Sequence, residues 1–107
     1  MIVIDLETSG IDPMEHSILS LGAVDFDNQF NTFYGECGLR EGAKFDEKAL
    51  EIAGFTVEQI KNCKLSCHEL LKKFMGWCIR IEDKTLAGHN VHFDISRHNP
   101  YRKNVFQ

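Results

Sequence analysis

The chain has 107 residues, enough for one domain but too few for two of ordinary size. Hydrophobic residues make up 43% of it and charged residues 26%, a balance typical of a soluble globular protein that excludes a disordered chain. The net charge of −4 argues against a protein that holds nucleic acid by bulk positive charge.

The chain carries no sign of a membrane span or a secretory leader. No apolar stretch approaches the ~20 residues that a membrane-spanning helix needs. The run Ile2-Val3-Ile4 is too short for the core of a signal peptide, and no basic leader precedes it. We therefore expect an intracellular, cytoplasmic protein with no membrane partner.

The charge is unevenly distributed along the chain. Residues 1–94 hold 9 basic and 16 acidic side chains, a net charge of −7. The last thirteen residues hold Arg97, Arg102 and Lys103 and no acid, a net charge of +3. We expect one domain over residues 1–96, followed by a basic and poorly ordered tail over residues 97–107.

Three strands are expected first. The apolar run over residues 2–7 favours a strand, and Gly and Pro within residues 9–13 mark the turn after it. Apolar and small residues suit a second strand over residues 17–26. Apolar and polar residues alternate over residues 29–37, which predicts a third strand and therefore a β-meander.

Helices are expected next. Asp46 caps a short one that Gly54 ends, and Thr56 begins a capping box for another. Ser66 and Glu69 form a second capping box, which opens the clearest helix of the chain. Its apolar positions are spaced by three and four residues: Cys67, Leu70, Leu71, Phe74, Trp77, Cys78 and Ile81.

A short fourth strand, Thr85-Leu86-Ala87 ending in Gly88, is expected within Lys84 to His89. A strand that follows a helix after a meander requires a crossover connection, so it would run parallel to a neighbour. The expected fold is an α/β domain built on a mixed sheet.

The four cysteines, Cys37, Cys63, Cys67 and Cys78, lack both the density of a disulfide scaffold and paired CxxC spacing. Cys63, Cys67 and His68 are a weak hint of a zinc site. Because Cys67 and Cys78 fit the apolar face of the long helix, buried free thiols are the favoured interpretation.

Asp5 and Glu7 are the first candidate site residues. Side chains alternate faces along a strand, so both carboxylates would point to one side, with Cα atoms roughly 7 Å apart. Two like charges on one face repel each other unless a cation lies between them or one is protonated. Mg²⁺ prefers carboxylate oxygens, so the pair indicates a divalent-metal site.

A second cluster, Gly88-His89-Asn90-Val91-His92-Phe93-Asp94, follows the fourth strand. Strand ends of this kind commonly carry ligand-binding groups in α/β sheets. If the fourth strand lies beside the first, Asp94 can approach Asp5 and Glu7 and complete a Mg²⁺ or Mn²⁺ site. In the alternative interpretation Asp94 caps a helix, and His89 and His92 lie on the surface.

Taken together, Asp5-Leu6-Glu7-Thr8 and the cluster ending in Asp94 resemble the first two motifs of the DEDDh 3′–5′ exonucleases. The stretch between them over residues 49–56 is also similar to that family, and the resemblance covers residues 1–96. It implies an RNase H-like fold, with a mixed five-stranded sheet flanked by helices. It also implies a two-ion Mg²⁺ or Mn²⁺ site, of which this chain could hold one ion only.

The resemblance also assigns roles to individual residues. Asp5, Glu7 and Asp94 match the catalytic carboxylates that bind metal, and Thr8 matches a residue that contacts the 3′-terminal nucleotide through its backbone. The partner implied is the 3′ end of single-stranded DNA or RNA. The residues expected to bind nucleic acid are Thr8, Ser9, His89, Asn90 and Phe93.

The sequence departs from this family after Asp94. The third motif, His-x4-Asp, should supply the general base and the fourth metal ligand, but no acid follows Asp94. His98 is a poor substitute for that base. We expect a fold that is incomplete at its C-terminal end, truncated before the third motif, and a weak or inactive enzyme. The tail is interpreted as a frame-shifted or prematurely ended product, or else as a basic arm for nucleic acid.

Two alternatives remain open. The first is a non-catalytic module that binds nucleic acid or a protein partner, in which a homodimer or a partner chain covers an exposed sheet edge. The second is a mononuclear hydrolase using His89, His92, Asp94 and His98, which would prefer zinc because imidazole suits that metal.

Overall fold

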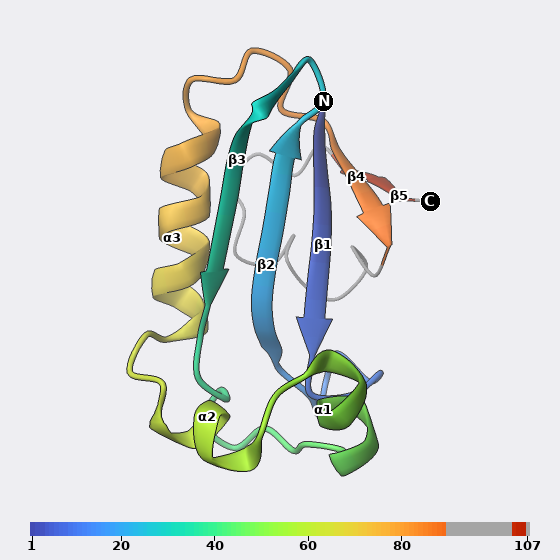
Figure 1. Ribbon diagram of the computed structural model, residues 1–107, viewed down its shortest axis with the longest axis vertical. Coiled ribbons are helices and arrows are strands. Elements are labelled where there is room, and N and C mark those ends of the chain that lie inside the picture. The colour runs from blue at the N-terminus through green and yellow to red at the C-terminus, as the bar shows by residue number, and fades with distance from the viewer. Residues whose placement is uncertain (90–103, 107) are drawn as a thin grey trace.

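The computed structural model describes residues 1–89 and 104–106, which form one mixed sheet with helices beside it (Figure 1). The strands lie in the order β3-β2-β1-β4-β5. Their bounds are β1 Ile2–Thr8, β2 Ile18–Asp25, β3 Asn28–Glu36, β4 Leu86–His89 and β5 Asn104–Phe106. The helices are α1 Glu47–Ala53, α2 Val57–Asn62 and α3 Cys67–Cys78. No helix in this described part of the chain is both long and apolar enough to cross a membrane.

The topology confirms the fold class expected from the sequence. β1, β2 and β3 pair antiparallel and form the predicted meander. The chain then crosses over through α3 and returns as β4, which pairs parallel with β1. The result is the expected mixed sheet of an RNase H-like fold.

β5 was not expected from the sequence, because Asn104–Phe106 is short and lies in the segment assigned to the basic tail. It pairs parallel with β4, where Leu86 lies opposite Asn104 and Gly88 opposite Phe106. The edge of β4 is therefore paired over these residues, whereas the alternative of a binding module assumed an exposed sheet edge. Residues 97–103 lie outside the described residues, so the domain boundary at residue 96 stays a prediction. The expected homodimer also stays a prediction.

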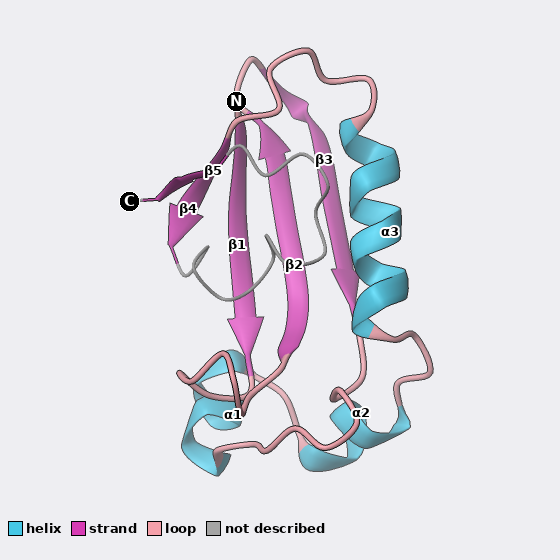
Figure 2. Cartoon of the chain, turned by 180° about the vertical axis from the view of Figure 1, so that it is seen from behind, coloured by secondary structure: helices cyan, strands magenta, loops and turns pink. Residues whose placement is uncertain are grey.

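α3 packs on one face of the sheet, as its apolar spacing predicts (Figures 1 and 2). Alternate residues of β1 point to this face, where Ile2, Ile4 and Leu6 are buried with Leu70 and Phe74 of α3. The same face holds an aromatic cluster in which the ring centroids of Phe33, Phe74 and Trp77 lie 5.7–6.0 Å apart. Burial of these side chains is the main favourable term in folding.

A second, smaller core joins β2 to α1 and α2, the two short helices at the end of the sheet where β1 ends (Figure 2). It consists of Leu19, Leu50 and Ile60. In the pairing of β1 with β2, Glu7 lies opposite Ser20 but Thr8 lies opposite Ile18, so Leu19 is the extra residue of a bulge. A bulge changes the direction in which a side chain points. Here the side chain of Leu19 is buried against the two short helices.

The predicted helix caps are confirmed. The Asp46 side chain accepts a hydrogen bond from the Lys48 backbone, and Gly54 ends α1 in the left-handed conformation with φ 82°. Thr56 with Gln59, and Ser66 with Glu69, form reciprocal capping boxes. These local hydrogen bonds fix where α2 and α3 begin.

Gly88 lets β4 approach β1 closely. Its φ is 156°, and a Cβ built there would collide with the Ile4 carbonyl group. Replacing Gly88 by alanine should therefore lower the free energy of unfolding by about 2 kcal/mol or more, as measured by urea denaturation.

Gly76→Ala is the matched control, because a Cβ at Gly76 meets no atom within 4 Å. Gly76 lies inside α3, so this change should raise the free energy of unfolding by about 0.5–1 kcal/mol. Equal effects of the two substitutions would contradict the proposed close approach.

Candidate active site

Asp5 and Glu7 lie on the face of the sheet opposite α3. Their neighbours in β1, Ile4 and Leu6, are buried in the main core, whereas Asp5 is exposed and Glu7 is half-buried. A single strand therefore contributes one face to the core and the other to the candidate site. The arrangement follows from the alternation of side chains along a strand.

The two carboxylates perturb each other. The pKa of Glu7 is raised above its ordinary value, first by partial burial and then by the negative charge of Asp5. Among the described residues, neither carboxylate forms an ion pair with a basic side chain. A neighbouring basic side chain would lower the pKa of a carboxylate. Because neither Asp5 nor Glu7 has such a neighbour among these residues, the negative charge of the pair is not neutralised unless a cation binds. Two carboxylates in this state are a donor set that suits a hard divalent ion.

Strand pairing places further residues on the same face. Glu7 lies opposite Ser20, which lies opposite Glu36; Asp5 lies opposite Gly22, which lies opposite Tyr34. Residues directly opposite each other in antiparallel strands share a face. No sequence pattern predicted Ser20, Tyr34 or Glu36 as site residues, because their places depend on the register of β2 and β3.

Tyr34 and Glu36 form a hydrogen-bonded pair at the edge of this face. The Tyr34 hydroxyl donates to a Glu36 carboxylate oxygen at 2.6 Å. This bond is the main cause that raises the pKa of Tyr34 above its ordinary value. Glu36 therefore already has a side-chain hydrogen-bond donor, whereas no side-chain hydrogen bond to Asp5 or Glu7 occurs within the described part of the chain.

A shallow hollow of about 270 Å³ lies over β1 and β2 at Asp5. Gly22 has no side chain, so nothing from β2 projects over Asp5 at this position. The lining residues are Val3, Ile4, Asp5, Gly22, Ala23 and Val24. The hollow leaves the Asp5 carboxylate open to a ligand from this side.

β4 places the first two residues of the second sequence cluster, Gly88 and His89, beside β1. Because β4 is parallel to β1, the backbone of His89 lies opposite Asp5. β4 therefore ends beside the part of β1 that carries Asp5. The predicted site residues Asn90, Phe93 and Asp94 lie outside the described residues, so their place in the site stays a prediction; the same holds for the zinc alternative with His92 and His98.

The turn after the carboxylates is held by an extensive set of hydrogen bonds. Thr8 donates its hydroxyl to the Gly10 carbonyl at 2.8 Å. Ser9 is fully buried; its hydroxyl donates to the Lys44 carbonyl and accepts from the Ser17 N–H, both at 2.8 Å. The Ser9 backbone is paired as well, its N–H with Ser17 and its carbonyl with Asp46. Ser9 therefore fixes the shape of the turn from inside.

The described residues contain no group of three or more His, Cys, Asp or Glu side chains placed to hold a metal. The hint of zinc at Cys63, Cys67 and His68 is therefore not supported there. All four cysteines are free, with Cys37 and Cys78 buried. For Asp5 and Glu7, the third ligand expected at Asp94 lies beyond the described part of the chain.

Comparison with known proteins agrees with this geometry. The RNase T exonuclease family model matches residues 2–107. A segment of the PolC-type DNA polymerase III of Thermotoga maritima is 32% identical over 98 residues. That match covers 87% of this chain but 6% of the polymerase.

Solved structures show the same fold. Exonuclease I from Methylocaldum szegediense superimposes with a TM-score of 0.72 at 19% identity, covering 99% of this chain and 27% of that one. A zinc-bound complex of E. coli exonuclease I with single-stranded DNA gives a TM-score of 0.72 at 17% identity, with the same two coverages of 99% and 27%. This chain thus spans about a quarter of the length of those enzymes.

The family match extends over nearly the whole chain, and the second motif begins, at Gly88 and His89, on the strand that pairs with β1. The chain therefore belongs to the RNase T exonuclease family, a group of DEDDh 3′–5′ exonucleases.

Proposed function

We propose that this chain forms the nucleic-acid-hydrolysing domain of a 3′–5′ exonuclease, with Asp5, Glu7 and Asp94 as catalytic metal ligands. The observation that carries the proposal is the pair of carboxylates on one face of β1, opposite the core, with a raised pKa at Glu7. The parallel pairing of β4 supports the role of Asp94, because it starts the second motif beside Asp5.

The proposed cofactor is Mg²⁺ or Mn²⁺. When bound, divalent ions activate the attacking water and stabilise the oxygen that leaves. Asp5 and Glu7 would hold the metal from one side of the site and orient it toward the nucleic acid. The cation would also offset the phosphate charge, which explains how an acidic chain could bind nucleic acid locally.

The proposed substrate is the 3′ end of a single strand, which is consistent with the single-stranded DNA in the exonuclease I complexes. Thr8 would contact the terminal nucleotide through its backbone, and His89, Asn90 and Phe93 would contribute from the second motif. Ser9 is fully buried, so its contribution would be indirect, through the shape of the turn.

Activity of these 107 residues by themselves is expected to be weak. The sequence supplies three of the family's four carboxylates, Asp5, Glu7 and Asp94. A chain that binds metal and a 3′ end with little hydrolysis would instead act as a binding module, which is the second candidate function. Hydrolysis and binding assays on the same oligonucleotides separate the two.

Mn²⁺ is expected to raise the melting temperature of the wild-type protein, because a cation relieves the repulsion between Asp5 and Glu7. Glu7→Gln should abolish this rise. Glu51→Gln is the control, because Glu51 is an exposed carboxylate of α1 and not part of the pair on β1, so the change should leave the rise intact. Differential scanning calorimetry with and without Mn²⁺ measures both. An undiminished rise in Glu7→Gln would contradict metal binding at this pair.

The raised pKa of Glu7 gives a pH dependence in the absence of metal. Its ionised carboxylate destabilises the folded protein, so stability is lost as the pH rises through the folded-state pKa. Glu7→Gln should therefore be more stable than wild type at pH 7, by well under ~1 kcal/mol because solvent screens the charge. The difference should disappear below the ordinary glutamate pKa of 4.5, where the carboxyl is protonated in both states. Thermal melts at both pH values test the sign.

Release of mononucleotides from end-labelled single-stranded DNA and RNA, with Mg²⁺ or Mn²⁺, tests the hydrolytic function. We expect slow release that Asp5→Asn lowers by at least ~100-fold, since a metal ligand is lost. Glu51→Gln should release at the wild-type rate. Release that is unchanged in Asp5→Asn would place the activity elsewhere, and rapid release from the wild-type chain would contradict the expected weakness.

A further inference from the structure

Two cysteines that lie far apart in the sequence meet away from the carboxylates. Cys37 follows the last residue of β3, and Cys67 is the first residue of α3. Their sulfur atoms are 3.2 Å apart, although 30 positions separate them in the chain. They are separate free thiols, so the pair is in contact but not bonded.

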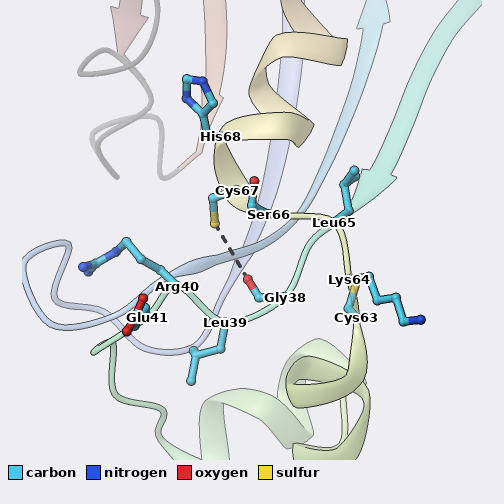
Figure 3. A pocket seen from close by; sticks show the side chains of 10 residues that line it. All are labelled: Gly38, Leu39, Arg40, Glu41, Cys63, Lys64, Leu65, Ser66, Cys67 and His68. Carbon is cyan, nitrogen blue, oxygen red and sulfur yellow. Dashed lines mark hydrogen bonds between the residues drawn. The ribbon is translucent and has the colours of Figure 1, made fainter.

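The two thiols differ in access. Cys37 is 2% exposed and lies in the main core. Cys67 is half-buried and lines a cavity of about 360 Å³, where its sulfur points toward the Gly38 carbonyl (Figure 3). A reagent that enters the cavity therefore reaches Cys67, with Cys37 behind it.

Two possible donors beside Cys67 favour its thiolate form, whereas in the thiol form Cys67 can donate to the Ile18 carbonyl at 3.3 Å. The Cys37 thiol can donate to Cys67, and the Ser17 hydroxyl lies 3.5 Å from the Cys67 sulfur. The bond from Cys37 is the main cause that lowers the pKa of Cys67 below its ordinary value, and the positive charge of Arg40 adds to it. The pKa of Cys37 is raised above its ordinary value, first by the same bond and then by burial.

We propose that Cys67 is a modification site for hydroperoxides, and that Cys37 resolves the oxidised sulfur to give a Cys37–Cys67 disulfide. The assignment rests on the 3.2 Å contact and on the cavity that opens at Cys67 but not at Cys37. A thiolate that is reachable from solvent and has a second thiol beside it is the arrangement that reversible cysteine oxidation requires.

The proposed reaction balances with one hydroperoxide. The Cys67 thiolate attacks a peroxide oxygen; an S–O bond forms, the O–O bond breaks, and the departing oxygen leaves as water or alcohol after taking a proton. The sulfur loses two electrons and the peroxide gains them. Cys37 then attacks the Cys67 sulfur, an S–S bond forms, and the hydroxyl oxygen leaves as water with the proton from Cys37.

The new bond would join the end of β3 to the start of α3. Both sulfur atoms lie within 3.3 Å of the Ile18 carbonyl oxygen of β2, so the disulfide would form next to this strand. Cys63 is the competing partner, since it lines the same cavity. Cys78 is buried in the main core on α3 and serves as an internal reference.

Peptide mapping of the full chain tests the proposal. The protein is treated with hydrogen peroxide, its remaining thiols are blocked with N-ethylmaleimide under denaturing conditions, and it is cut with trypsin. Cleavage after Lys and Arg places the four cysteines in separate peptides: residues 1–40, 62–64, 65–72 and 74–80. We expect peptides 1–40 and 65–72 to be linked, with two of the four thiols lost.

Variants separate the two roles. Cys63→Ser should form the same link as wild type. Cys37→Ser should leave Cys67 as a sulfenic acid that dimedone traps, because no resolving thiol remains. Cys67→Ser should leave Cys37 reduced at the same peroxide dose.

Three results would overturn the proposal. They are a link between peptides 62–64 and 65–72, the survival of all four thiols in the wild type, and oxidation of wild-type Cys67 to the sulfinic acid without any disulfide. None of these measurements depends on nuclease activity, so the proposal can fail while the proposed function stands.

Discussion

The parallel pairing of β1 with β4 is the constraint on which the rest of the structure depends. β1 has β2 on one side and β4 on the other, so it is the strand through which both halves of the sheet are joined. The register that sets Asp5 opposite His89 also places the start of the second motif beside the first, although more than eighty residues separate them in the chain. Gly88 permits this register, because any side chain there would collide with Ile4. Fold and candidate site therefore share one set of backbone contacts.

The two faces of β1 have opposite effects on the stability of the fold. Ile2, Ile4 and Leu6 are at most 2% exposed and supply a large part of the main core. Asp5 and Glu7 point the other way and repel each other, which raises the pKa of Glu7. The repulsion opposes folding, and the buried face offsets it. A site that is electrostatically unfavourable in the free protein gains more when a cation binds.

Local signals predicted most of the fold, and non-local pairing accounts for what they missed. Alternation along β1, the spacing of three and four along α3, and the capping boxes at Thr56 and Ser66 are all readable within a few residues. β5 was missed because three residues carry no periodicity and its pairing partner is β4. Asp5 and Glu7 were proposed from alternation alone, whereas the pairing of β1 with β4 entered the sequence reasoning only as a condition for bringing Asp94 to them. Tyr34 and Glu36 needed the register of β3 against β2, which no local pattern encodes.

Ser17 connects the candidate metal site to the thiol pair. Its backbone N–H donates to the Ser9 hydroxyl, which is buried within the turn that follows the carboxylates. Its own hydroxyl accepts from the Arg40 backbone and lies 3.5 Å from the Cys67 sulfur. The turn and the thiol pair are therefore anchored on one buried residue just before β2. A disulfide formed at Cys67 would change the partners of the Ser17 hydroxyl without altering Asp5 or Glu7, so any effect on nucleic-acid binding would pass through the shape of the turn and not through loss of a metal ligand.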